Sequence, residues 1–174
     1  MKTYNIEDIK KFAKSSSNYV EDEENEQEKT YSVEDFDKAK TRMLKYIFYK
    51  KRTESEVRKK FLKDYSESIV DDVIENLKEN GYLSDENYVE KAVNEFIALK
   101  HLSRKEIKYK LMAKGTKTSA IENFFDNNYD QLTEYEIKSA KHLAQKKKSQ
   151  MEDIDIKRYL MKKGYSEESI KEAL

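Results

Sequence analysis

Apolar residues recur every three or four positions through most of this 174-residue chain, with polar residues between them. This spacing places the apolar side chains on one face of a helix, so each such segment is predicted to form an amphipathic helix. The first stripe lies in residues 34–49, the second follows Thr53, and the third follows Ser66. The first contains Phe36, Ala39, Met43, Leu44, Ile47 and Phe48, and the third contains Ile69, Val70, Val73, Ile74 and Leu77. We therefore expect an all-α fold.

Three of these segments share a phrase, at residues 57–63, 107–115 and 156–164. Its anchors Val57, Ile107 and Ile156 are spaced by 50 and 49 residues. A repeat of this length is a supersecondary unit that stacks on copies of itself, which produces long binding surfaces rather than closed catalytic pockets. We predict an elongated array of three tandem three-helix repeats, at residues 36–83, 84–130 and 131–174, after an acidic segment at 1–35.

Helix starts and ends agree with this division. Capping-box sequences begin at Thr53, Ser103 and Thr133, each with a glutamate three residues later. In such a box the hydroxyl accepts from an unpaired backbone N–H, and the glutamate bonds back to the capping residue. The three glycines, Gly81, Gly115 and Gly164, follow helical stripes, where glycine enters the left-handed conformation without a Cβ penalty. Proline is absent, which favours long helical stretches.

The charge is uneven although the net charge is zero. Residues 1–35 contain 5 basic and 10 acidic residues, whereas residues 36–174 contain 30 and 25. Much of the acidic excess lies in residues 21–28, a run typical of a solvated linker. The alternative is an acidic tail that competes with DNA for a basic surface. Residues 6–12 form at most one short amphipathic helix before this run.

The sequence contains little catalytic chemistry. There is no cysteine, and the two histidines, His101 and His142, lack the spacing of a metal site, so we expect both to be ordinary surface or helix-end residues. Three isolated glycines cannot form a phosphate-binding loop. No catalytic residue, metal or cofactor is therefore expected. The chain has 13 tyrosines. Tyrosine suits a thin core in which the ring is buried and the hydroxyl reaches solvent, and alternatively it stacks on nucleic-acid bases.

The second helix of each predicted repeat is basic. Residues 104–114 contain five basic residues and one acid, residues 54–63 contain four and two, and residues 152–163 contain four and three. Residues 66–80 contain one lysine and five acids, so charge is sorted by helix. A repeated basic element fits an acidic partner such as phosphates or a protein filament, although each side chain taken alone fits a solvated helix face. The candidate partner-binding residues are Arg52, Arg58, Lys59, Arg104, Lys105, Lys108, Lys110, Lys114, Lys157, Arg158, Lys162 and Lys163.

Several phrases resemble the RecX family of regulatory proteins. Residues 77–89 read Leu-Lys-Glu-Asn-Gly-Tyr-Leu-Ser-Asp-Glu-Asn-Tyr-Val, which is similar to the family's L-x-x-x-G-Y-x-x-D-x-x-Y/F-A passage with Val89 in place of the usual alanine. Residues 159–166 resemble its closing Y-L-x-x-K-G-F/Y-S phrase, and residues 52–57 resemble its R-T-x-x-E-L opening. The resemblance covers residues 36–174, whereas residues 1–35 match little.

The resemblance implies three tandem three-helix repeats, no enzymatic activity, and a partner, the RecA recombinase filament on single-stranded DNA. Such proteins modulate the filament's assembly and ATP hydrolysis, and through them homologous recombination, DNA repair and the SOS response. We expect a cytoplasmic monomer, because no apolar run approaches the roughly 20 residues of a membrane span and residues 1–12 lack a secretory apolar stretch.

Two other functions stay open from the residues alone. One is a helical module that binds nucleic acid directly, with single-stranded DNA as partner, since a basic helix within a three-helix unit resembles helix-turn-helix geometry. Against it, the net charge is zero and no helix has a face rich in Arg, Asn and Gln that would bind base edges. The other is a scaffold for an unrelated protein.

Overall fold

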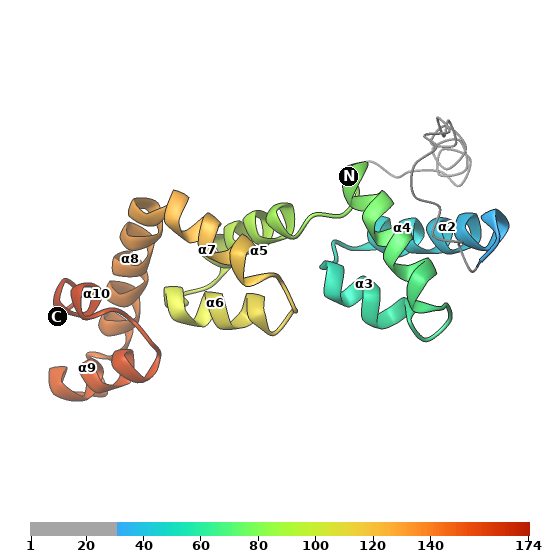
Figure 1. Cartoon of the computed structure of the whole chain (residues 1–174). Coiled ribbons are helices and arrows are strands. Elements are labelled where there is room, and N and C mark those ends of the chain that lie inside the picture. Colours follow the sequence, from blue (N-terminus) through green and yellow to red (C-terminus); the bar gives the residue numbers. More distant parts are fainter. Residues whose placement is uncertain (1–30) are drawn as a thin grey trace. The chain divides into compact units, whose positions relative to one another are not determined.

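The computed structural model describes residues 31–174, and every regular element in that range is a helix. The all-α prediction is therefore confirmed for this part of the chain. In order, the helices are α2 (Val33–Tyr49), α3 (Glu54–Phe61), α4 (Glu67–Glu79), α5 (Asp85–Leu99), α6 (Arg104–Met112), α7 (Thr118–Asn127), α8 (Tyr129–Lys147), α9 (Asp153–Lys162) and α10 (Glu167–Lys171) (Figure 1). The short helix predicted at residues 6–12 and the acidic run at 21–28 lie outside the described residues.

The described chain divides after Ser84 into two compact units. The first contains α2, α3 and α4, which we call repeat 1. The second contains α5–α7, called repeat 2, and α8–α10, called repeat 3. Contacts within each group of three helices agree with the predicted three-helix units. That all three repeats form an elongated array stays a prediction.

Repeat 1 encloses an apolar core between α2, α3 and α4. Met43 from α2, Val57 from α3 and Val73 from α4 are each completely buried. Helix α3 starts where the sequence predicts, because Thr53 and Glu56 form the expected capping box there. Gly81 has φ +71° after α4, the left-handed conformation that favours glycine at a helix end.

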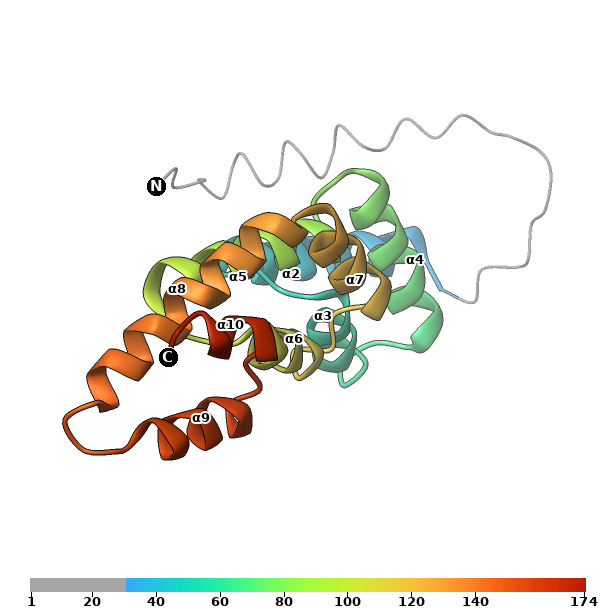
Figure 2. The same ribbon diagram turned by 90° about the vertical axis from the view of Figure 1, so that its left-hand side faces the viewer.

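Repeats 2 and 3 have separate apolar cores but pack against each other. Ile107, Leu111 and Ile121 lie in the core of repeat 2, and Ala140, Ile156 and Leu160 lie in that of repeat 3. Helix α8 contacts α9 and α10 within its own repeat and also contacts α6 and α7 (Figure 2). The second unit is therefore a pair of three-helix bundles with a common interface, which we call the repeat 2–3 junction.

The capping box predicted at Thr133 is wrong. Helix α8 begins at Tyr129, only Asn128 separates it from α7, and Thr133 already lies in its second turn. The Thr133 hydroxyl donates to the Tyr129 carbonyl at 2.8 Å instead of capping a helix. The backbone groups that a cap would satisfy are already bonded inside a continuous helix. The boxes at Thr53 and Ser103 are confirmed.

Candidate partner-binding surface

The three basic helices are α3, α6 and α9, the second helix of each repeat. Their anchors Val57, Ile107 and Ile156 are all 0% exposed, so the repeated phrase directs its apolar residues into the three cores. Side chains three and four positions apart share a face of a helix. The cations next to each anchor therefore lie on the outer side of its helix. The sequence pattern alone therefore orients the candidate surface within each repeat.

Half of the twelve candidate cations form ion pairs within their own unit. These pairs are Arg52–Glu56, Arg58 with Glu54 and Asp71, Arg104–Glu136, Lys108–Glu122, Arg158–Asp155 and Lys163–Glu106. Most of the side chains involved are partly exposed, and pairs of this kind contribute about 0–1 kcal/mol each. These six cations are therefore less available to a partner than the sequence suggests.

Five other candidates are exposed and form no ion pair with any residue in the range 31–174. They are Lys59, Lys105, Lys110, Lys157 and Lys162. At least one of them lies on the basic helix of each repeat. An exposed lysine without an internal carboxylate keeps its full charge available, so these five define the part of the candidate surface that is free to bind an acidic partner.

Arg104 has an internal role at the repeat 2–3 junction. Its backbone N–H donates to Glu136 Oε1 at 2.8 Å, its Nε donates to Oε2 at 3.2 Å, and its Nη1 donates to Thr133 Oγ1 at 2.8 Å. Glu136 is only 1% exposed and also accepts from the hydroxyls of Ser166 and Ser169 at 2.8 and 3.0 Å. A buried carboxylate is tolerated only when a charge and several donors compensate it, as here.

The connection between α5 and α6 is bound to repeat 3 along its length. The Tyr135 hydroxyl accepts from the Leu102 N–H at 3.0 Å and donates to the Lys100 carbonyl at 2.9 Å. The Tyr165 hydroxyl donates to the His101 carbonyl at 3.0 Å. Burial is the main cause that raises the pKa of both tyrosines, so both stay protonated donors.

The start of α6 is fixed in the same way, because the Ser103 hydroxyl donates to the Lys163 carbonyl at 2.7 Å. Gly164 follows at once, and a Cβ there would lie 3.1 Å from the Lys105 Cβ. The orientation of basic helix α6 is therefore set by repeat 3.

The two histidines come together at this junction, which their spacing did not indicate. The rings of His101 and His142 stack with centroids 3.8 Å apart and an angle of 15° between them. Burial lowers the pKa of His101 below its usual value, and the nearby His142 and Lys146 lower it further. No group of three or more His, Cys, Asp or Glu side chains in residues 31–174 could hold a metal ion.

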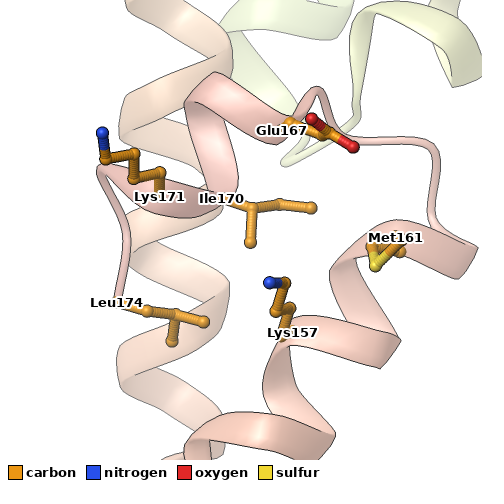
Figure 3. A pocket seen from close by; sticks show the side chains of 6 residues that line it. All are labelled: Lys157, Met161, Glu167, Ile170, Lys171 and Leu174. Carbon is orange, nitrogen blue, oxygen red and sulfur yellow. The ribbon is translucent and has the colours of Figure 1, made fainter.

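A groove of about 500 Å³ lies between α9 and α10 of repeat 3 (Figure 3). Its lining residues are Lys157, Met161, Glu167, Ile170, Lys171 and Leu174. The Lys157 side chain points toward Ile170, whereas the Lys171 ammonium points away from Lys157 (Figure 3). The groove combines apolar side chains with two lysines and the single carboxylate of Glu167, so it has no pair of carboxylates placed for acid–base chemistry.

Comparison with known proteins identifies the family. No model of a known protein family matches the chain. The regulatory protein RecX of Staphylococcus carnosus is 35% identical over 135 residues, which cover 75% of this chain and 51% of that protein. The RecX of Caldanaerobacter subterraneus subsp. tengcongensis is 30% identical over 138 residues, 78% of this chain and 68% of that protein. The RecX of Clostridium botulinum strain Eklund 17B is 35% identical over 147 residues, 79% and 67%. The chain belongs to the RecX family of regulatory proteins.

Solved structures of RecX have the same fold. The crystal structure of RecX from Lactobacillus salivarius superposes with a TM-score of 0.72 at 25% identity, over 80% of this chain and 94% of that one. A second RecX crystal structure superposes with a TM-score of 0.68 at 26% identity, over 78% and 71%. The chain spans about half the length of the Staphylococcus carnosus RecX.

The resemblance to RecX proteins read from the sequence is thus confirmed, but sequence reasoning missed the junction. Glu136 looked like part of a capping box, and Tyr135 and Tyr165 looked like ordinary partly buried tyrosines. The sequence held no signal for this role, because a glutamate inside a helix is normally solvated and only the fold shows which one is buried. No helix among residues 31–174 of this RecX-family chain is long and apolar enough to cross a membrane.

Proposed function

We propose that this RecX-family chain is a non-enzymatic regulator that binds RecA filaments on single-stranded DNA. By this binding it modulates filament assembly and activity in recombination, DNA repair and the SOS response, as a cytoplasmic monomer. Family membership supports the choice of partner. The observation that carries the proposal is that each repeat presents, on its second helix, exposed lysines without an internal ion pair.

A filament is a periodic polymer, and periodic partners suit periodic surfaces. The basic helices recur at intervals of 50 and 49 residues, so each repeat offers a similar cationic face. Several weak contacts made together bind far more tightly than any single one, because the later contacts form at high effective concentration.

The test uses a variant with Lys59, Lys105, Lys110 and Lys157 all changed to Glu. It leaves out Arg104 and Lys108, whose ion pairs would be lost and would confuse binding with stability. We expect co-sedimentation with RecA, assembled on single-stranded DNA with a slowly hydrolysed nucleotide, to weaken by at least about tenfold. The thermal unfolding temperature should change little, since the four side chains are exposed and unpaired.

The matched control changes Lys45, Lys50, Lys91 and Lys148 to Glu, four exposed lysines outside the basic helices. It carries the same change in net charge, so it should retain most of the filament binding. Equal binding by the two variants would show that the basic helices are not the contact surface.

Direct binding to single-stranded DNA is the second candidate. It is favoured by Tyr109, which is 59% exposed on α6 with the Lys105 ammonium 6.0 Å from its ring centre, a combination suited to stacking beside a phosphate. Phosphate-driven binding falls steeply with salt. Binding to bare DNA that matches filament binding at about 0.15 M salt would favour this alternative.

A further inference from the structure

The second helices of the three repeats carry a cation at an equivalent position. Arg58, Lys108 and Lys157 each follow directly after a buried anchor of the repeated phrase. The third helices also have an equivalent position, directly after a buried apolar residue. That buried residue is Val70 in repeat 1, Ile121 in repeat 2 and Ile170 in repeat 3, and one residue follows each. The three residues that follow are Asp71, Glu122 and Lys171.

In repeats 1 and 2 these two positions form an ion pair. Arg58 binds Asp71, and the Lys108 Nζ lies 2.5 Å from Glu122 Oε2. Each pair joins the second helix of a repeat to its third helix. The cation that follows the anchor is therefore neutralised inside repeats 1 and 2.

Repeat 3 breaks this rule, because Lys171 replaces the carboxylate. Lys157 forms no ion pair with any residue in the range 31–174, and the two lysines point apart, as like charges do (Figure 3). Lys157 thus extends over the floor of the groove between α9 and α10 without the acidic partner that its equivalents have.

The groove also exposes apolar surface. Met161, one helical turn after Lys157, is 53% exposed, and Leu174 is 41% exposed. The residues equivalent to Met161 are Leu62 and Met112, which are 43% and 42% exposed. Exposed apolar surface on the second helix is therefore common to the three repeats, and repeat 3 differs in its unpaired lysine. An apolar floor beside an unpaired cation fits an amphipathic protein segment better than a nucleic-acid backbone, which offers charge but little apolar surface at its phosphates.

We propose that the groove between α9 and α10 binds an acidic residue of a partner protein together with a neighbouring apolar residue. The partner's carboxylate pairs with Lys157, as Asp71 and Glu122 pair with Arg58 and Lys108. Its apolar side chain packs on Met161, Ile170 and Leu174, and methionine adapts to irregular surfaces of this kind. That the partner is the RecA filament rests on the function proposed above.

The first experiment changes Lys171 to Glu, which restores the internal carboxylate of the other two repeats. We expect the new glutamate to pair with Lys157 and close the site, so that binding to RecA filaments weakens by about tenfold while the unfolding temperature is unchanged or slightly raised. A loss of binding caused merely by damage to the fold would lower the unfolding temperature. The control Lys91→Glu makes the same charge change on α5 of the same unit and should bind like the parent.

The second experiment tests the apolar half of the groove. Met161→Ser should weaken filament binding several-fold, whereas Met151→Ser removes a methionine that is 38% exposed outside the groove and should have little effect. Filament binding by Lys171→Glu and Met161→Ser equal to that of the parent would overturn the assignment of the groove to this partner and leave the proposed function standing.

A third experiment needs no filament. Methyl-labelled methionine gives five reporters, of which Met161 lies in the groove and Met43 is fully buried in repeat 1. A short helical peptide with leucines and glutamates on one face should shift the Met161 signal and not that of Met43. The same peptide with glutamines should bind several-fold more weakly, and Lys171→Glu should remove the difference.

The filament-binding and peptide experiments distinguish a failure of the proposed function from a failure of the groove assignment. If the parent chain fails to bind RecA filaments, the proposed function falls and the peptide titration decides the groove by itself. If neither peptide shifts Met161, or if the glutamine peptide binds equally well, the acidic-plus-apolar chemistry of the groove is wrong.

Discussion

The interiors of the repeats and the repeat 2–3 junction are built from different chemistry. The core of repeat 1 consists of apolar side chains such as Met43, Val73 and Leu77. The junction instead buries Glu136, Ser139 and Ser169, none of them more than 2% exposed. Apolar packing is non-directional, whereas hydrogen bonds fix distances and angles. The cores therefore decide that helices collapse into bundles, and the junction decides how two bundles are placed against each other.

The most damaging test of this comparison is Glu136→Ala. It leaves the Arg104 guanidinium without its carboxylate and removes the acceptor of two serine hydroxyls, so we expect the free energy of unfolding to fall by about 3–5 kcal/mol in urea titrations. The control Glu134→Ala, two residues earlier in α8, removes only an exposed pair with Lys138 and should cost less than about 1 kcal/mol. Equal effects of the two variants would mean that the junction is not held by buried polar contacts.

A milder test removes one hydroxyl from the junction. Tyr165→Phe keeps the ring but removes the hydroxyl that lies 2.7 Å from the Ser139 hydroxyl and 3.0 Å from the His101 carbonyl. We expect a loss of about 1–2 kcal/mol in unfolding free energy. Tyr109→Phe, on the exposed face of α6, serves as the control and should be neutral within about 0.5 kcal/mol. A neutral Tyr165→Phe would contradict the role assigned to this hydrogen-bonded pair.

The smallest expected effect concerns pH. The pKa of His101 is lowered in the folded chain, first by burial and then by His142 and Lys146, so the unfolded chain takes up the proton first as the pH falls. Stability should therefore be complete above the unfolded pKa of about 6.5 and should decline slightly as the pH falls below it. His101 is exposed enough for solvent to screen much of this effect. The unfolding temperature between pH 7.5 and 5 measures it, and His142→Asn should reduce the slope.

The candidate site was only partly predictable. The basic helices and all twelve cations could be read from the sequence, since a periodic pattern fixes which residues share a face. Which cations are neutralised could not be read, because Arg104 and Lys105 are neighbours and look alike. In the fold, one is bonded to buried Glu136 and the other is exposed. The groove could not be predicted for the same reason. Lys171 is important only because it stands opposite Lys157 of another helix, where the other repeats have a carboxylate.

The sequence by itself determined the helices, two of the capping boxes, the glycine helix ends and the inward face of each repeat. These features depend on interactions within about four residues, so local pattern suffices to specify them. Only the tertiary structure decided that Thr133 lies inside α8, that Glu136 joins repeats 2 and 3, and that the two histidines stack. Each of these depends on which groups from distant parts of the chain compete for the same hydrogen bond or the same space, and a linear pattern does not contain that information.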